Sequence, residues 1–187
     1  LVNNYKKSNE PFVSAWESSG ENKEAAKQVP KTVLSVAERG DLEALKEMIS
    51  RDKNADNYTA LHRAAYNNHV DCLSYLLSIG ADHEARTVDG WTPLHCASRW
   101  ASAACVGELI SHGAYVNSRT NNNLTPLHLI LNSDEPLDKI HETFRYLLES
   151  PGSFFLFLSN ADETPLELAR KGPKLIASTI EKFISRP

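Results

Sequence analysis

Three of the seven histidines are spaced so regularly that a metal site is the first chemistry to consider. His62, His95 and His128 follow one another at intervals of 33 residues, each directly after a leucine. Imidazole is a common zinc ligand. However, an interval of 33 residues places the three histidines on separate helices of a repeated unit, and such helices pack about 8–10 Å apart. The ligands of one zinc ion each lie about 2 Å from it. The three histidines therefore cannot share a metal, and we expect no metal and no cofactor.

A nucleophile with its general base is the second chemistry to consider, because His95 stands directly before Cys96. Adjacent residues of a helix point about 100° apart, and no third residue is placed to orient the imidazole. The sequence also contains no G-x-x-x-x-G-K-[ST], G-x-G-x-x-G or G-x-S-x-G motif. We therefore expect a protein that is not an enzyme.

Cysteine usage and charge narrow the compartment and the class of partner. Cys72, Cys96 and Cys105 are an odd set without C-x-x-C spacing, and we interpret them as reduced thiols that pack as small hydrophobic side chains. With no signal-peptide pattern at the start, they predict a nuclear or cytoplasmic protein rather than a secreted one. The net charge of −4 is dispersed, which argues against direct binding of nucleic acid. The longest apolar run, Phe154–Leu158, is far shorter than the roughly 20 residues that cross a membrane.

The histidine spacing belongs to a repeated stretch of sequence. Residues 87–97 read T-V-D-G-W-T-P-L-H-C-A. Similar stretches lie one period earlier, at residues 56–65 (D-N-Y-T-A-L-H-R-A-A), and one period later, at residues 122–129 (N-N-L-T-P-L-H-L). Two equal intervals that each bring back the same Leu-His pair identify a repeat protein.

Each unit predicts two helices and a turn. Thr92 is a favourable N-cap, and Pro93 suits the first helical position, where its missing N–H costs nothing. The apolar positions of the second helix are Cys105, Val106, Leu109 and Ile110. Gly113 then suits the left-handed position after a helix end. A single helix–turn–helix unit leaves its apolar faces exposed, so we expect neighbouring units to stack on both sides.

The pattern D-G-x-T-P-L-H-x-A, followed by L-L-x-x-G-A-D, resembles the ankyrin repeat and covers residues 31–185 with degenerate ends. Within ankyrin proteins, residues 61–66, residues 87–95 and Trp100 are similar to a small family, ankyrin repeat domain-containing protein forty-nine. The resemblance implies L-shaped repeats without catalytic activity that bind other proteins through their hairpins and inner helices. It also implies that each repeated histidine ties its helix start to a hairpin.

We predict an all-α ankyrin solenoid of helix–turn–helix plus hairpin units, with five repeats that include two degenerate caps. Its repeats are expected at about residues 31–53, 54–86, 87–119, 120–158 and 159–187. Residues 1–30 are rich in Ser, Asn, Glu and Lys and predict a flexible N-terminal arm. Phe12, Val13 and Trp16 in this arm either dock on the first repeat or form a short binding motif.

The fourth repeat departs from the pattern in two places. About five residues are inserted near 133–139, where Pro136 and three acidic residues suit an exposed turn. The apolar run Phe154–Leu158 replaces the usual hairpin. This run is either buried against the last repeat or exposed as a patch for a partner or for self-association.

The resemblance also indicates where a partner would bind. Ankyrin proteins usually bind through the residue before the threonine and the two residues after the paired alanines. These positions gather aromatic residues and an arginine, the composition typical of binding hot spots. The predicted partner-binding residues are Tyr58, Tyr66, Asn67, Trp91, Arg99, Trp100 and Leu124. The alternative for Trp91 is packing on the next hairpin, and Trp100 stands where the family normally has a polar residue.

We therefore predict a monomeric intracellular adaptor or regulator that binds another protein, through an acidic or apolar segment, on its concave face and hairpins. The alternative is a passive structural module whose arm carries the binding. Asn117 in Y-V-N resembles the asparagine that a 2-oxoglutarate-dependent hydroxylase modifies in many ankyrin proteins. The alternative for Asn117 is a residue chosen for its turn geometry.

Overall fold

The computed structural model describes residues 36–37, 39–44, 59–153 and 157–184. The chain divides into residues 1–30 and residues 31–187, and every described residue belongs to the second unit. The predicted arm, Tyr58, and residues 154–156 of the apolar run all lie outside the described residues.

The described part of the chain is helical and contains no strand, which confirms the predicted all-α class. Residues 36–37, 39 and 42–44 are also helical and precede the labelled helices. The labelled helices are α3 (Ala60–Tyr66), α4 (Val70–Ser78), α5 (Pro93–Arg99), α6 (Ala103–Ser111), α7 (Pro126–Leu131), α8 (Leu137–Glu149), α9 (Pro165–Lys171) and α10 (Lys174–Ile184).

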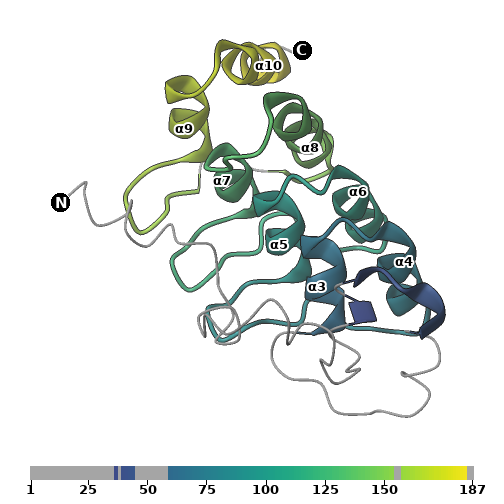
Figure 1. The fold of residues 1–187 in the computed structure, drawn as a ribbon. Helices are drawn as coiled ribbons and strands as arrows, with labels where there is room; N and C mark the ends of the chain where they lie inside the picture. Colours follow the sequence, from purple (N-terminus) through teal and green to yellow (C-terminus); the bar gives the residue numbers. More distant parts are fainter. Residues whose placement is uncertain (1–35, 38, 45–58, 154–156, 185–187) are drawn as a thin grey trace, which may run out of the picture. The chain divides into compact units, whose positions relative to one another are not determined.

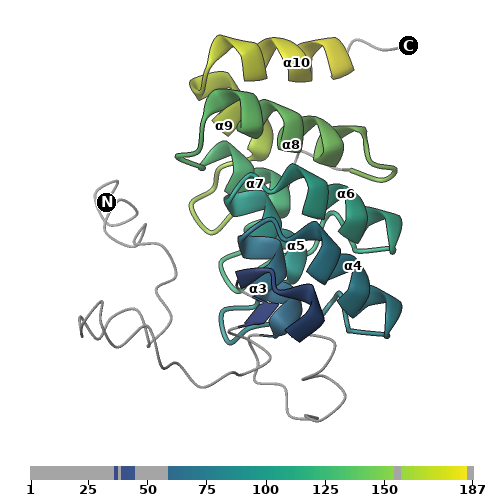
Figure 2. The ribbon, with the colours of Figure 1, turned by 45° about the vertical axis from the view of Figure 1, so that its right-hand side comes forward.

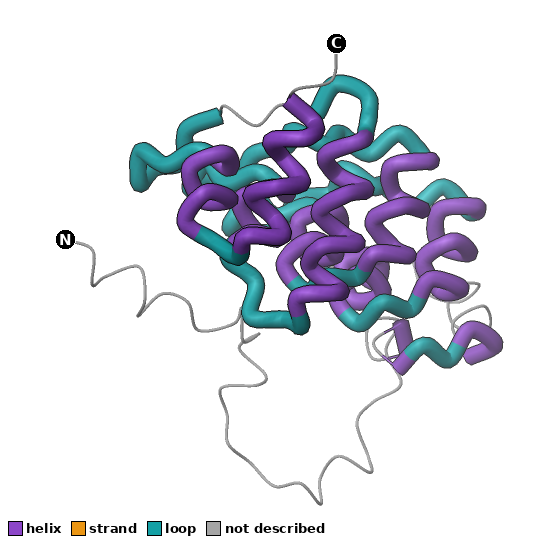
Figure 3. Tube along the Cα trace, turned by 90° about the horizontal axis from the view of Figure 1, so that it is seen from above, coloured by secondary structure: helices purple, strands orange, loops and turns teal. Residues whose placement is uncertain are grey.

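The helices of residues 31–187 stack in two rows (Figures 1 and 2). We call α3, α5, α7 and α9 the first row, and α4, α6, α8 and α10 the second row. Each helix packs on its neighbours in its own row and on the partner helix of its own repeat. Isolated helices shorter than about 12–15 residues are marginal in water, so these short helices depend on stacking. This is the predicted solenoid, and Figure 3 shows the described helices joined only by loops.

A single core runs along the stack. It extends from Val36 and Ala37 through the small and branched residues of each repeat to Ile180. All three cysteines are free thiols buried in this core or against it. Burial raises the pKa of Cys105 to about 12, so its thiol stays neutral and packs as a small hydrophobic group.

The turns that precede α5, α7 and α9 share one hydrogen-bond pattern. Before α5, the Thr87 N–H donates to the Trp91 carbonyl (2.9 Å), and the Trp91 N–H donates to Thr87 Oγ1 (3.1 Å). The same backbone and side-chain bonds recur in the pairs Thr120 with Leu124 and Ser159 with Glu163. Gly90 has a left-handed φ of 77°, and an added Cβ would lie 2.6 Å from Asn121 Oδ1, so glycine is required there.

The fourth repeat differs from its neighbours where the sequence departs from the pattern. Helix α8 has 13 residues, whereas α4 and α6 have nine each. Pro136, with φ −54°, is the N-cap of α8, so residues 132–136 form the connection from α7. Next to the part of the apolar run that the structure does not describe, Phe157 is half-buried and Leu158 is 54% exposed.

Candidate functional site

The repeated histidines join α3, α5 and α7 each to the next turn. His62 is fully buried, and its Nδ1 accepts the N–H of Thr59, the N-cap of α3 (3.2 Å). Its Nε2 donates to the carbonyl of Trp91 in the following turn (3.0 Å). A carbonyl only accepts and a backbone N–H only donates, so the two contacts fix the neutral tautomer with its proton on Nε2.

The pattern recurs in the next two repeats. Nδ1 of His95 accepts the Thr92 N–H (3.1 Å), and its Nε2 lies 3.0 Å from the Ser118 carbonyl and 3.2 Å from the Leu124 carbonyl. Nδ1 of His128 accepts from Thr125 (3.1 Å), and its Nε2 donates to Glu163 (3.1 Å).

The histidines are therefore ties between repeats. Burial lowers the pKa of His62 and His95 to about 4, although the bonds to backbone carbonyls act in the opposite direction. Burial also lowers the pKa of His128. These imidazoles are neutral near pH 7, with both nitrogens occupied, so they serve neither as bases nor as ligands. Elsewhere in the described residues, no group of three His, Cys, Asp or Glu side chains is placed to hold a metal.

In two of the predicted partner-binding residues, Trp91 and Leu124, the backbone carbonyl accepts hydrogen bonds that hold the fold together. The carbonyl of Trp91 accepts from His62 and from Thr87, and the carbonyl of Leu124 accepts from His95 and from its own turn. The Trp91 side chain is half-buried against the core, with its ring centroid 6.3 Å from that of His95. Part of the Trp91 ring therefore packs within the fold, and the remainder faces solvent; the Leu124 side chain is also half-buried.

The structure brings three other predicted residues together. Tyr66 ends α3, and Arg99 ends α5 with Trp100 as its C-cap. The rings of Tyr66 and Trp100 are 4.7 Å apart between centroids and tilted by 52°. The Arg99 guanidinium carbon lies 5.1 Å from the centroid of the Trp100 ring, a cation–π arrangement. Tyr66 and Trp100 are partly buried, whereas the Arg99 side chain is only 12% exposed, so mainly aromatic surface reaches solvent at the turns of two adjacent repeats.

A fourth residue, which the sequence did not single out, completes this group. Asp134 Oδ2 lies 3.1 Å from Arg99 Nη2 and comes from the connection between α7 and α8. The neighbouring Ser133 hydroxyl donates to the Arg99 carbonyl (2.8 Å). We call Tyr66, Arg99, Trp100 and Asp134 the Trp100 cluster. The only sequence signal for Asp134 was its place in an acidic insertion, and nothing local connected it with a residue 35 positions earlier.

The Asn67 side-chain amide caps its own helix and forms no part of the Trp100 cluster as defined above. Its Nδ2 donates to the Arg63 carbonyl (3.2 Å), which satisfies the end of its own helix α3. Asn67 is half-buried at the C-cap of that helix. Tyr58, the remaining predicted binding residue, lies outside the described residues.

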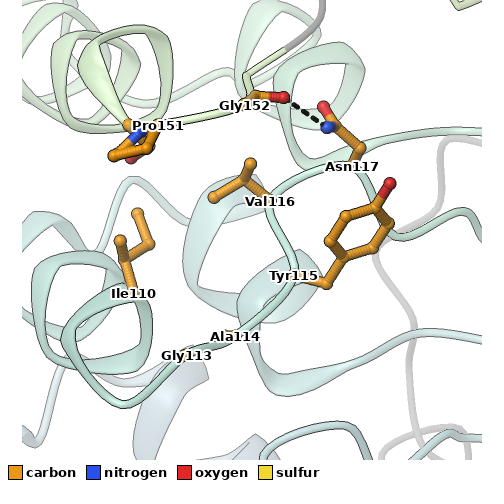
Figure 4. Close-up of a pocket in the computed structure, with 9 residues that line it drawn as sticks. Ile110, Gly113, Ala114, Tyr115, Val116, Asn117, Pro151 and Gly152 are labelled. Carbon is orange, nitrogen blue, oxygen red and sulfur yellow. Dashed lines mark hydrogen bonds between the residues drawn. The ribbon is translucent and has the colours of Figure 1, made fainter.

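Asn117 ties two turns together. Its side chain is buried, and Nδ2 donates to the Gly152 carbonyl (2.7 Å; Figure 4). Glu84 stands one period earlier and makes a comparable link, since its carboxylate accepts the Tyr115 N–H (2.8 Å) and the Ser118 hydroxyl (3.2 Å). A modifying enzyme would have to separate Asn117 from Gly152 before it could reach the side chain.

A hollow of about 310 Å³ adjoins Asn117 (Figure 4). Its lining residues are Ile110, Gly113, Ala114, Tyr115, Val116, Asn117, Ser150, Pro151 and Gly152. The lining is mostly apolar, and the Tyr115 phenol is its one titratable side chain. The hollow therefore offers no pair of titratable groups for acid–base chemistry, and its one serine hydroxyl, that of Ser150, donates to the Tyr146 carbonyl. Among the described helices, none combines the length and the apolar character needed to cross a membrane.

Comparison with known proteins supports the repeat architecture. A family model described as "Ankyrin repeats (3 copies)" matches residues 17–87, 33–120 and 80–155. "Ankyrin repeat domain-containing protein 49" of Bos taurus is 36% identical over 74 residues, which cover 36% of this chain and 31% of the relative. The Homo sapiens protein of the same name is 34% identical over 74 residues, with the same coverage. The Drosophila melanogaster protein is 37% identical over 82 residues, which cover 38% of each chain.

This chain spans about a third of the length of these curated relatives. The matches confirm the similarity to ankyrin repeat domain-containing protein 49 that the sequence indicated. Ankyrin repeats are generally protein–protein interaction modules on a non-catalytic fold. The family model covers well over half of the chain, and the stacked helix pairs agree with it. This chain therefore belongs to the ankyrin repeat family.

Proposed function

We propose that this chain recognises another protein through the Trp100 cluster and the adjoining turns, as an intracellular adaptor or regulator in the nucleus or the cytoplasm. The observation that carries the proposal is the Tyr66–Trp100 stack with the Arg99 guanidinium beside it. Tyrosine, tryptophan and arginine are the residues most enriched in binding hot spots. Here the two aromatic side chains are partly exposed, and Arg99 is mostly buried beside them, at the turns of two adjacent repeats.

The arrangement also supports a partner class. An aromatic pair with partly exposed faces offers apolar contact area, and a stacked guanidinium offers a planar fork for a carboxylate. The Arg99 side chain is mostly buried and lies over the Trp100 ring, so little side-chain freedom is lost on binding. An apolar or acidic segment of a partner protein fits these features.

One observation favours a second function. Trp100 packs on Tyr66 of the preceding repeat, so the aromatic pair also stabilises the stacking of α3 on α5. In a passive structural module this packing would be the whole role of the pair. Partner binding would then be carried by the N-terminal arm.

Truncation of the aromatic anchor distinguishes the two functions. Full-length protein and Trp100→Ala should be compared by affinity purification from cells, with binding of each recovered partner then measured by calorimetry. If the cluster is a hot spot, Trp100→Ala should weaken binding by about tenfold or more. Tyr146→Ala is the matched control, because Tyr146 is an aromatic residue on α8 that is 48% exposed and lies outside the cluster.

Thermal melting of each variant reports on the alternative. A passive aromatic pair would lower the melting temperature of Trp100→Ala while the affinity for every recovered partner stayed at the wild-type value. That result would contradict the proposed function. Loss of binding in Phe12→Ala and Trp16→Ala instead would transfer the role to the arm.

A further inference from the structure

We propose that Asp134 is an internal competitor at the Trp100 cluster, which gives way to a carboxylate of an acidic partner segment. This inference rests on the proposed function and names the partner's chemistry at the same site. It assigns a role to the acidic insertion of the fourth repeat.

The two partners of the ion pair are buried to very different extents. The Arg99 side chain is 12% exposed, whereas the Asp134 side chain is 92% exposed. A guanidinium taken out of water needs acceptors for its donors. The single contact from Asp134 reaches Nη2, while Nη1 is buried and has no hydrogen-bond acceptor among the described residues. The fork of Arg99 is therefore only partly used in the free protein.

The connection that carries Asp134 is held in place independently of this carboxylate. Ser133 Oγ donates to the Arg99 carbonyl (2.8 Å), and the Glu135 N–H donates to the same hydroxyl oxygen (3.3 Å). The Glu135 carboxylate pairs with Lys139 (3.6 Å) instead of with Arg99. Only the solvated Asp134 side chain would have to rotate away to leave Arg99 to another carboxylate.

Displacement of Asp134 is energetically cheap, since an ion pair with one highly solvated partner contributes little to stability. A partner carboxylate that takes the place of Asp134 makes the same charge-assisted hydrogen bond to Nη2, and its segment gains the contact with the aromatic pair in addition. The Arg99 guanidinium lies over the Trp100 ring, with its carbon 5.1 Å from the ring centroid, so the ring contacts it from a side other than Asp134. Asp134 therefore lowers the affinity of the site for acidic partners, which must displace it, without blocking the site.

A defined peptide tests the inference directly. The probe is a fluorescein-labelled eight-residue peptide of alternating glutamate and leucine, with glutamine in place of glutamate as the control peptide. Fluorescence anisotropy with the full chain should give a lower Kd for the glutamate peptide. Asp134→Asn should tighten its binding about two- to fivefold, the range expected from removing one exposed competing ion pair. Arg99→Gln should weaken it about tenfold or more.

Asp138→Asn is the matched control for charge. Asp138 is an exposed acid in the first turn of α8, only four residues from Asp134. This variant makes the same change in net charge and should alter the affinity less than Asp134→Asn does. Equal tightening by both variants would mean that general electrostatics is responsible, and it would overturn the inference.

The remaining outcomes separate the inference from the proposed function. If Asp134→Asn leaves binding unchanged or weakens it while Arg99→Gln and Trp100→Ala abolish it, Asp134 is no competitor but the recognition site stands. If Arg99→Gln and Trp100→Ala bind the peptide and every cellular partner as wild type does, the proposed function itself fails. If Arg99→Gln proves unstable, binding can be followed by NMR instead, through the indole N–H signal of Trp100. Trp100→Phe assigns this signal. Its shift on titration with the glutamate peptide then gives the affinities of the wild type and of Asp134→Asn. Absence of a shift at saturating peptide would overturn the inference.

Discussion

Histidine occupies the third position of helices α3, α5 and α7, and Glu167 occupies the same position of α9. Both side chains serve their own N-cap. Glu167 Oε2 accepts the Thr164 N–H (2.8 Å) and the Thr164 hydroxyl (3.0 Å), just as each histidine Nδ1 accepts from its threonine. Unlike Glu167, each histidine also donates a hydrogen bond from Nε2 to a carbonyl of the next turn.

This difference separates two roles that a repeat motif usually combines. Capping a helix start requires an acceptor, which either residue supplies. Coupling one repeat to the next requires a donor on the opposite side of the same side chain, and only imidazole carries both. Glu167 has an acceptor for its own cap and no donor for a neighbouring turn, so it supplies capping alone.

Acidification should give the largest effect, because it acts on all three histidines together. Burial sets the pKa of His62 and His95 to about 4, against 6.5 ordinarily, and lowers that of His128. The unfolded chain therefore binds more protons than the folded chain between pH 6.5 and 4. The free energy of unfolding should be highest above this window and fall as the pH falls through it, by about 3 kcal/mol for each of His62 and His95.

Urea unfolding at a series of pH values measures this loss. Glu167→Gln provides the control, because hydrogen bonds from Thr164 lower the Glu167 pKa below 4.5, so its contribution is lost only at lower pH. The control should therefore follow the wild-type curve between pH 7 and about 5. A free energy of unfolding that stays constant from pH 7 to about 4.5 would show that the histidines are not held neutral.

Removing one coupling histidine should have the next largest effect. His95→Ala leaves the Thr92 N–H and the Ser118 carbonyl without their buried partner, whereas the Leu124 carbonyl keeps its bond from the Thr120 N–H. Unsatisfied buried groups cost about 1–3 kcal/mol each, so we expect a loss of about 3–5 kcal/mol in the free energy of unfolding. Glu167→Ala should cost only a small fraction of this, because its partners are exposed to water.

Hydrogen exchange locates the damage. In His95→Ala, amide protection should fall in both flanking repeats, since each repeat is stabilised by its neighbours. His112→Ala, at the exposed end of α6, is the control for loss of an imidazole as such. Equal losses in His95→Ala and Glu167→Ala would mean that capping, not coupling, is what the histidine provides.

Breaking the link made by Asn117 should have a smaller effect. Asn117→Ala removes one hydrogen bond to Gly152, in a turn that the backbone also closes. We expect a loss of about 1 kcal/mol in the free energy of unfolding. Mass spectrometry of the wild-type protein from cells tests the modification at the same residue. A hydroxylated Asn117 would require this link to open, whereas an unmodified peptide at full coverage would leave Asn117 with its structural role.

Replacing Glu167 with histidine should have the smallest effect on the free energy of unfolding. In Glu167→His, Nδ1 can still accept from Thr164, but Nε2 would find no carbonyl of a following turn among the described residues. The free energy of unfolding near pH 7 should therefore stay within the error of a urea titration. A clear stabilisation would show that histidine is the better cap by itself and would weaken the distinction between capping and coupling.

The positions of the helices could be predicted because they depend on near neighbours. A threonine before a proline begins α5, α7 and α9, and apolar residues at helical spacing continue the second-row helices. Caps and amphipathic faces are decided within about four residues along the chain. The interval of 33 residues also places the histidines in separate repeats, which predicts that they lie too far apart to share a metal ion.

The composition of the Trp100 cluster was only partly predictable. The repeat register placed Tyr66 and Trp100 in adjacent repeats, but their 4.7 Å stack depends on how α5 packs beside α3. The exposed position of the insertion was foreseen from its acids and proline, whereas its contact with Arg99 was not.

The sequence by itself therefore determined which residues are helical, which cap them and which repeat. Only the tertiary structure decided that His95 meets carbonyls 23 and 29 residues away, and that Asp134 reaches Arg99 across 35 residues. The physical reason is that local backbone preferences act over single turns of helix, whereas these pairs form only when the stacking of whole repeats sets their separation.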